Sequence, residues 1–269
     1  MDRFLARSQR FAVVGSTNDV IREWLAEGTP EVCLAIADEQ TAGRGRQGRT
    51  WRAPKGAALL LSLGFRPTWL DPARAWQLSA VTSLAMAEAA EDLAGLPNGR
   101  IGLKWPNDLV VEWGGGVRKL AGVLGETDGL GGRDPRVVVG IGMNVDWPAT
   151  AFPPELADSM TSLREIARGR PVDRIALSAA FVERLRVGVQ ALRGGRFHAD
   201  DWTARQITTG REIDLTPADG GPPQTFRASG VDATSGALLV QSDRGSGVRS
   251  VVVGEVARVR LTASTASGV

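Results

Sequence analysis

Three short apolar runs, separated by turns too short to cross a sheet, constrain the fold of this chain most strongly. The runs are residues 101–105, 109–112 and 117–126, and the turns are 106–108 (Pro-Asn-Asp) and 113–116 (Trp-Gly-Gly-Gly). Proline, asparagine, aspartate and glycine favour turns, and strands joined by so few residues are neighbours in an antiparallel meander. A fourth apolar run covers residues 136–145. The sequence therefore predicts a mainly antiparallel sheet.

Helical patterns alternate with further strand-like runs in the first part of the chain. Residues 15–18 (Gly-Ser-Thr-Asn) can cap a helix that ends at Gly28, and Asp71-Pro72 begins a long alanine-rich helix that closes at Gly95. The other predicted helices are 173–192 and 197–207, and the other predicted strands are 10–14, 32–37 and 57–65. Together they indicate an α+β fold, a mixed sheet with packed helices.

The character of the sequence changes near Gly210. After it come short β-type runs broken by glycine, proline and aspartate, at 212–215, 225–231, 238–241, 248–253 and 256–261. Short strands so closely spaced predict a small closed barrel. We therefore predict two domains, residues 1–210 and 211–269, with a loose tail from Thr262 to Val269.

Residue types that enzymes often use are scarce. The chain has one cysteine, Cys33, one histidine, His198, and no tyrosine. An intrachain disulfide and a Cys/His zinc cluster are therefore impossible, and a Ser-His-Asp triad would have to use His198, which lies in a polar helix start. No run approaches the about 20 apolar residues of a membrane span, and the segment after Met1 lacks the apolar core of a secretion signal. We expect a cytoplasmic location.

Positive charge is concentrated in one segment, residues 41–55, which contains five basic residues and no acid. They are Arg44, Arg46, Arg49, Arg52 and Lys55. The formal net charge is +2, so the rest of the chain is formally −3. This distribution disfavours a broad surface for nucleic acid and indicates a local anion site.

The same segment fits two nucleotide-binding patterns and fails the structural context of both. Gly43, Gly45 and Gly48 match G-x-G-x-x-G, and residues 43–50 nearly match the P-loop, with Arg49 in place of lysine. Both patterns require a helix directly after the glycines, whereas Pro54 and an apolar strand follow here. What remains is a glycine loop whose backbone and arginines can surround phosphate oxygens, with Trp51 beside them as a flat face for a purine.

A set of motifs in a fixed order resembles the biotin protein ligases. The motifs are Ser16-Thr17-Asn18, Gln40, residues 43–51, residues 104–108 (Lys-Trp-Pro-Asn-Asp), residues 119–122 (Lys-Leu-Ala-Gly) and residues 140–144 (Gly-Ile-Gly-Met-Asn). The resemblance extends from about residue 10 to residue 261. It implies a class II synthetase-like catalytic domain followed by an SH3-like β-barrel.

The resemblance also implies a two-step reaction. Biotin and ATP, with Mg²⁺, give biotinyl-5′-AMP and pyrophosphate, and the biotinyl group then passes to a lysine of a biotin carboxyl carrier domain. The carboxylate of biotin is already ionised, so the first step needs cations and backbone N–H groups rather than a general base. A chain almost empty of histidine, cysteine and tyrosine can perform such a step.

Carried over by position, the resemblance assigns roles to residues of this sequence. Those expected to bind the ureido head of biotin are Ser16, Thr17, Asn18 and Gln40. Those expected around the biotin carboxylate and the phosphates are Arg44, Gly45, Arg46, Arg49 and Lys119. Those expected to contact or position the adenylate are Trp51, Lys104, Asn107, Gly142 and Asn144. The predicted catalytic residues are Arg44, Arg46, Asp108 and Lys119. Asp108 could orient a metal ion or the incoming amine, and the identity of the metal ligands is left open.

The expected partner is a biotin carboxyl carrier domain of a carboxylase. Only about ten residues precede the first predicted strand, so we expect no winged helix and no sequence-specific DNA binding, and we expect a monomer or weak homodimer that does not bind membranes. Two alternatives stay open: a lipoate or octanoate ligase or transferase of similar fold, and an RNA-binding module.

Overall fold

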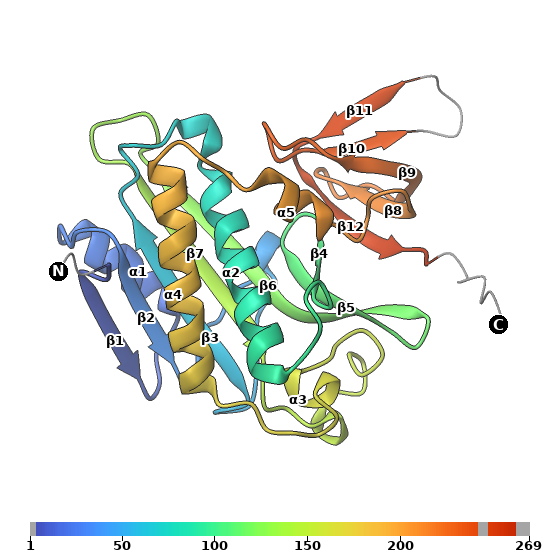
Figure 1. Cartoon of the computed structure of the whole chain (residues 1–269), viewed down its shortest axis with the longest axis horizontal. Coiled ribbons are helices and arrows are strands. Elements are labelled where there is room, and N and C mark those ends of the chain that lie inside the picture. Colours follow the sequence, from blue (N-terminus) through green and yellow to red (C-terminus); the bar gives the residue numbers. More distant parts are fainter. Residues whose placement is uncertain (1–3, 242–246, 262–269) are drawn as a thin grey trace.

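A seven-stranded sheet forms the first part of the molecule (Figure 1), in the order β1-β2-β3-β7-β6-β5-β4. Its strands are β1 (Arg7–Phe11), β2 (Cys33–Ala37), β3 (Ala58–Phe65), β4 (Gly102–Lys104), β5 (Asp108–Trp113), β6 (Gly116–Asp128) and β7 (Arg136–Asn144). This computed structural model describes residues 4–241 and 247–261. β1 and β2 are parallel, and the other neighbours in this sheet are antiparallel. The predicted mainly antiparallel α+β fold is confirmed.

The first strand lies earlier than predicted. The prediction of residues 10–14 was wrong, because β1 runs from Arg7 to Phe11 and pairs in register with Cys33 to Ala37. Val14 makes only an isolated bridge, to Gln40. β1 is an edge strand with a polar, exposed sequence, so it lacks the apolar pattern by which a buried strand is recognised.

Two long helices cover one face of the sheet, α2 (Trp76–Ala94) and α4 (Arg174–Arg193) (Figure 1). α2 follows a short turn of helix that Asp71 caps by accepting from the N–H of Ala73, and it ends at Gly95, whose φ is +63°. Asp173 caps α4 in the same way. Side chains along β7 point alternately to the two faces of the sheet. Val137 and Val139 belong to the core beneath these helices, whereas Val138 belongs to a cluster on the opposite face.

The opposite face of the sheet is only partly covered. α1 (Thr17–Ala26) packs there, and its residues Ile21, Trp24 and Leu25 form a core with Cys33 and Val138. Farther along β7 the same face carries Gly140 and Gly142 instead of large apolar side chains. This uncovered part of the sheet is where the candidate site lies.

Two short helices, α3 (Leu163–Ile166) and α5 (Ala199–Ala204), lie on either side of α4 in the chain, and a second sheet follows α5. Its order is β11-β10-β9-β8-β12. The strands are β8 (Glu212–Pro217), β9 (Gln224–Val231), β10 (Leu238–Gln241), β11 (Val248–Val251) and β12 (Gly254–Val259). Every strand contributes to one apolar cluster, so the sheet curls around its own core. The tail predicted for residues 262–269 lies outside the described residues.

Trp105 joins the two sheets. It belongs to the connection between β4 and β5, yet it is 4% exposed and packs in the core of the second sheet. Its indole Nε1 donates to the carbonyl oxygen of Gly236 at 3.0 Å. The 105–108 turn is therefore held by both sheets, and the domain boundary near residue 210 stays a prediction.

Within residues 4–241 and 247–261, no helix combines the length and apolar character needed to cross a membrane.

Candidate active site

A cavity of about 290 Å³ lies on the uncovered face of the first sheet. Most of the predicted site residues line it, namely Ser16, Thr17, Asn18, Gln40, Arg44, Gly45, Arg46, Arg49, Trp51, Asn107, Lys119 and Gly142. They come from the start of α1, the segment after β2 (Gln40), residues 43–51 (the arginine-glycine loop), the 105–108 turn, β6 and β7. The fold thus brings together residues that are far apart in the sequence.

One end of this cavity is neutral, buried and hydrogen-bonded. Gln40 Oε1 accepts from the backbone N–H of Thr17 at 2.7 Å and from its hydroxyl at 2.9 Å. Ser62 Oγ lies 2.7 Å from Thr17 Oγ1 and 2.5 Å from Asn18 Oδ1. The Asn18 amide donates to Glu126 Oε2 at 2.7 Å. These bonds fix the polar groups before any ligand binds.

Sequence reasoning missed Ser62 and Glu126. Ser62 is the one hydroxyl residue inside an otherwise apolar strand, β3, and it is fully buried. A buried hydroxyl needs a hydrogen-bond partner, so its position in the run was a usable signal. Glu126 carried no comparable signal, because it sits near the exposed end of β6.

The arginine-glycine loop is a narrow hairpin. Arg44 and Thr50 form a β-bridge, and Gly45 N donates to Arg49 O at 2.6 Å. A Cβ on Gly43 would lie 2.6 Å from the carbonyl oxygen of Trp51, so only glycine fits there. The tip turns through Gln47, with a φ of 55°. The loop therefore projects its arginines from a defined backbone.

Two of the loop arginines are paired with acids. Arg44 binds both oxygens of Asp19, at 2.8 and 2.7 Å, and Arg49 binds both oxygens of Glu255, on β12, at 2.7 and 2.8 Å. The hydrogen bond from Arg44 lowers the pKa of Asp19, although burial opposes the shift. The positive charge of the loop is thus partly offset, once by α1 and once by the second sheet.

Arg46 is different, because it is bound to a neutral group. Both of its terminal nitrogens lie 3.3 Å from the carbonyl oxygen of Gly254. Burial lowers the pKa of Arg46 from its ordinary value, and the charge of Glu255 opposes this shift. An arginine remains protonated under such conditions, so Arg46 offers a partly desolvated positive charge.

Two lysines converge on one buried carboxylate. Asp108 Oδ1 is 2.6 Å from Lys119 Nζ, and Asp108 Oδ2 is 3.2 Å from Lys104 Nζ. Burial opposes ionisation of Asp108, but the two ammonium groups outweigh it and hold the pKa of this carboxyl below its ordinary value. Lys104 also donates to the carbonyl oxygen of Val256 at 3.0 Å. The cluster therefore carries one net positive charge and is anchored to β12.

Trp51 lines the cavity where its ring packs against Gly142 of β7. Its ring lies so close to Gly142 that a Cβ there would be 2.5 Å from Cε2. Lys119 Nζ stands 5.6 Å from the ring centroid, within cation–π range. The buried indole Nε1 of Trp51 has no hydrogen-bond partner among the described residues.

A second cavity, of about 500 Å³, adjoins the first. Both are lined by Arg46, Asn107, Val123 and Leu124. Lys104 and Asp108 face the second cavity, between α2 and the second sheet. Asn107 is oriented by its donation to the carbonyl oxygen of Val123 at 2.7 Å. Two chambers thus meet beside Arg46.

Asn144 is the predicted site residue that lines neither chamber. It is 3% exposed, and its amide donates to the carbonyl oxygen of Thr161 at 2.9 Å. Thr161 N in turn donates to the backbone oxygen of Lys119. Asn144 therefore supports the segment that holds Lys119.

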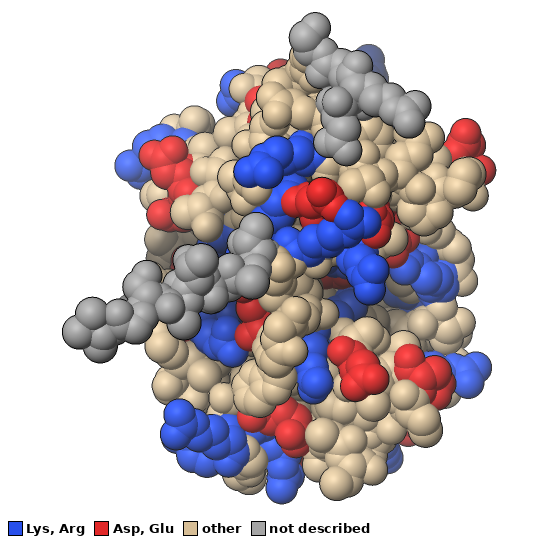
Figure 2. Space-filling view, turned by 90° about the vertical axis from the view of Figure 1, so that its right-hand side faces the viewer, with Lys and Arg blue, Asp and Glu red and all other residues tan. Residues whose placement is uncertain are grey.

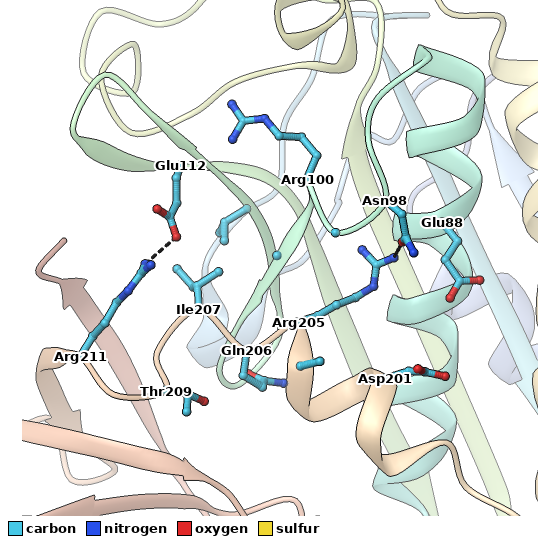
Figure 3. A pocket seen from close by; sticks show the side chains of 14 residues that line it. Glu88, Asn98, Arg100, Glu112, Asp201, Arg205, Gln206, Ile207, Thr209 and Arg211 are labelled. Atoms are coloured by element: carbon cyan, nitrogen blue, oxygen red, sulfur yellow. Dashed lines mark hydrogen bonds and ion pairs between the residues drawn. The ribbon is translucent and has the colours of Figure 1, made fainter. Parts of the chain in front are cut away.

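A further cavity, shown in Figure 3, contains none of the predicted residues. Two of its three cations are already paired with acids. Arg211 binds Glu112 at 2.6 Å, and Arg205 binds the buried Glu91 at 2.9 Å. Figure 2 shows that acidic and basic side chains are interspersed on the face that carries the second sheet. The cationic groups that face a ligand-sized space and lie close together are those of the two adjoining chambers.

In the part of the chain that the structure describes, no three His, Cys, Asp or Glu side chains gather into a group that could hold a metal ion.

Comparison with known proteins agrees with this site. A sequence model of the Biotin/lipoate A/B protein ligase family matches residues 11–144. The biotin--[acetyl-CoA-carboxylase] ligase of Mycobacterium tuberculosis is 35% identical over 205 residues, which cover 75% of this chain and 71% of that protein. The bifunctional ligase/repressor BirA of Escherichia coli is 32% identical over 235 residues, 86% of this chain and 68% of that protein.

A solved structure agrees with these sequence relatives. The biotin protein ligase from Aquifex aeolicus in complex with biotin and ATP superposes with a TM-score of 0.75 at 27% identity, covering 93% of this chain and 97% of that one. The match spans both sheets. Sequence relatives and structure together show that this chain belongs to the biotin protein ligase family.

Proposed function

We propose that this chain catalyses ATP-dependent ligation of biotin to a lysine of a biotin carboxyl carrier domain. In the first step a biotin carboxylate oxygen attacks the α-phosphorus of ATP, the bond to the β-phosphate oxygen breaks, and pyrophosphate leaves. In the second step the lysine amine attacks the carbonyl carbon of biotinyl-5′-AMP. The bond to the phosphate oxygen breaks, AMP leaves, and the amine loses a proton.

The meeting of two chambers beside Arg46 is the observation that carries the proposal. The smaller chamber has a neutral, prebuilt end and a cationic end, as an uncharged ring with a carboxylate tail requires. The larger chamber shares the cationic end, where Arg46 and the Asp108 cluster lie. Two anions that repel each other in water can be held in contact there, which is the main task of the first step.

The site residues then divide by position. Thr17, Asn18 and Gln40, with Ser16, bind the ureido head. Arg46 and Lys119 stabilise negative charge as it moves from the attacking carboxylate to the α-phosphate oxygens and pyrophosphate. Asp108 keeps both lysines in place, which makes it a positioning residue for this step. Trp51 and Asn107 contact the nucleotide side of the adenylate.

Magnesium enters this proposal with the nucleotide. Mg²⁺ commonly binds through substrate phosphates and few carboxylates, and it neutralises charge on the leaving pyrophosphate. The one buried carboxylate in the larger chamber, Asp108, already binds two lysines. The donor set of this chain therefore fits an ion carried by ATP. A cytoplasmic location and a monomer or weak dimer remain part of the proposal.

Biotin-dependent exchange of ATP with pyrophosphate tests the first step. We expect exchange with biotin and far slower exchange with lipoate or octanoate, and then transfer of biotin to a purified carrier domain. Exchange that prefers lipoate would favour the lipoate ligase alternative. No exchange with any acid, together with tight RNA binding at moderate salt, would favour the RNA-binding alternative.

A further inference from the structure

The neutral end of the smaller chamber continues, through hydrogen bonds, to a carboxylate outside the predicted site. The bonds run from Gln40 through Thr17, Ser62 and Asn18 to Glu126. Asn18 is 5% exposed and Ser62 is fully buried, whereas the Glu126 side chain is 28% exposed. The middle of the network is thus buried, and its last member is a partly exposed carboxylate.

Ser62 is the ambiguous member of this network. Its hydroxyl has one hydrogen but two oxygen neighbours, Asn18 Oδ1 at 2.5 Å and Thr17 Oγ1 at 2.7 Å. The hydroxyl hydrogen of Thr17 is directed to Gln40. Ser62 can donate to Asn18 Oδ1 or to Thr17 Oγ1, and the choice depends on which atom of the Asn18 amide faces it.

The orientation of the Asn18 amide decides between these two states. With Nδ2 toward Glu126, the carbonyl oxygen Oδ1 faces Ser62 and takes its hydrogen. The flipped amide would place Oδ1 against the Glu126 carboxylate, and two acceptors would then face each other without a hydrogen. Arg22 Nη2 lies 3.9 Å from Glu126 Oε1. The acceptor oxygens of Glu126 therefore select one amide orientation.

The backbone of β7 limits the movement of Asn18 on one side. A Cβ on Gly140 would lie 2.2 Å from Asn18 Oδ1, so the amide packs directly on the backbone of β7. The amide can still flip about its terminal torsion. Its hydrogen-bond partners therefore determine which face it shows to Ser62.

We propose that Glu126 is a positioning residue for biotin binding. Its carboxylate accepts from Nδ2 of Asn18 and so holds the Asn18 amide, which lines the smaller chamber, in one orientation toward the ureido head. This inference rests on the proposed function. It adds a residue that does not line the chamber but orients one that does.

The test compares Glu126→Leu and Glu126→Gln with the unmodified chain in biotin-dependent pyrophosphate exchange. We expect Glu126→Leu to raise the KM for biotin on the order of 10-fold, as for loss of a hydrogen bond to a charged group, with kcat and the KM for ATP within about 2-fold. Glu126→Gln keeps an oxygen that accepts from Asn18, so its KM rises about 3-fold. Asp128→Asn, on the same strand and 80% exposed, is the matched control and changes neither KM.

A substrate analogue separates positioning from a merely structural role. In 2-iminobiotin the ureido oxygen is replaced by nitrogen, so an acceptor becomes a donor. We expect the preference of the unmodified chain for biotin over 2-iminobiotin to fall on the order of 5-fold in Glu126→Leu, because the Asn18 amide can then flip and exchange its donor and acceptor.

An unchanged KM for biotin in both variants would overturn the inference. So would parallel losses in kcat and both KM values with a lowered Tm and an unchanged preference for biotin over 2-iminobiotin. An unmodified chain that shows no exchange with biotin would remove the proposed function itself, and this inference with it.

Discussion

The two ends of the smaller chamber are held in place in opposite ways. The neutral end is fixed by hydrogen bonds that join α1 to Gln40, which follows β2, and to Ser62 of β3. All three lie in the first part of the molecule. The charged end is fixed from outside that sheet, because Arg46 and Arg49 bind Gly254 and Glu255 of the second sheet. The neutral end is therefore held within the first part of the molecule, while the placement of Arg46 and Arg49 depends on the second sheet.

This difference has a physical reason. Buried neutral groups can satisfy one another at short range, whereas clustered guanidinium groups need acids or carbonyls from elsewhere to lie close together. Substitutions at the two ends should consequently change different kinetic constants.

The largest expected effect is at the charged end. Arg46→Ala or Lys119→Ala should reduce kcat/KM for biotin-dependent pyrophosphate exchange on the order of 100-fold, because each removes a group that stabilises charge at phosphorus. Arg133→Ala, an exposed arginine in the loop after β6, is the control. Near-normal exchange in Arg46→Ala would show that the charged end is misplaced.

At the neutral end, Gly140→Ala should act on biotin alone. The new Cβ would lie 2.2 Å from Asn18 Oδ1, so the amide must move. We expect the KM for biotin to rise on the order of 10-fold while the KM for ATP changes little. Gly247→Ala, where a Cβ meets nothing within 4 Å, is the control. An equal rise in both KM values would contradict the separation of the two ends.

A smaller effect is expected where the second sheet holds the loop. Glu255→Gln removes the carboxylate that binds both terminal nitrogens of Arg49. Since the Arg49 side chain is 52% exposed, the pair is weak, and we expect the KM for ATP to rise only about 3-fold. Glu212→Gln, which breaks another Arg–Glu pair of the same sheet, should leave the KM for ATP unchanged. A change in the KM for biotin alone would contradict the assignment of Arg49 to the charged end.

The last expected effect is on stability and its pH dependence, not on a kinetic constant. The pKa of Asp108 is lower in the folded chain than its ordinary value, so the ionised carboxylate stabilises the fold at neutral pH, and this stabilisation is lost as the pH falls below about 4. Asp108→Asn should therefore cost roughly 2 kcal/mol in unfolding free energy at pH 7. Urea unfolding should show that difference shrinking at acidic pH. A difference that is constant with pH would contradict the ion cluster.

Much of this could be predicted from the sequence because its signals are local. The meander, the capped helix at Asp71 and the five late strands each depend on nearby residues, and most residues of the motifs line one cavity. The contacts that join Arg46 and Lys104 to β12 span more than 150 positions in the chain. No periodicity encodes such contacts, nor the hydrogen bond between Asn18 and Glu126.

A crystal structure with a non-hydrolysable analogue of biotinyl-5′-AMP tests the central claim most directly. We predict the ureido ring between Thr17 and Gln40, and the acyl-phosphate where the chambers meet, with Arg46 and Lys119 both within hydrogen-bond distance of its oxygens. An analogue bound elsewhere, with Arg46 still on the Gly254 carbonyl and Lys119 away from the phosphate, would contradict the account.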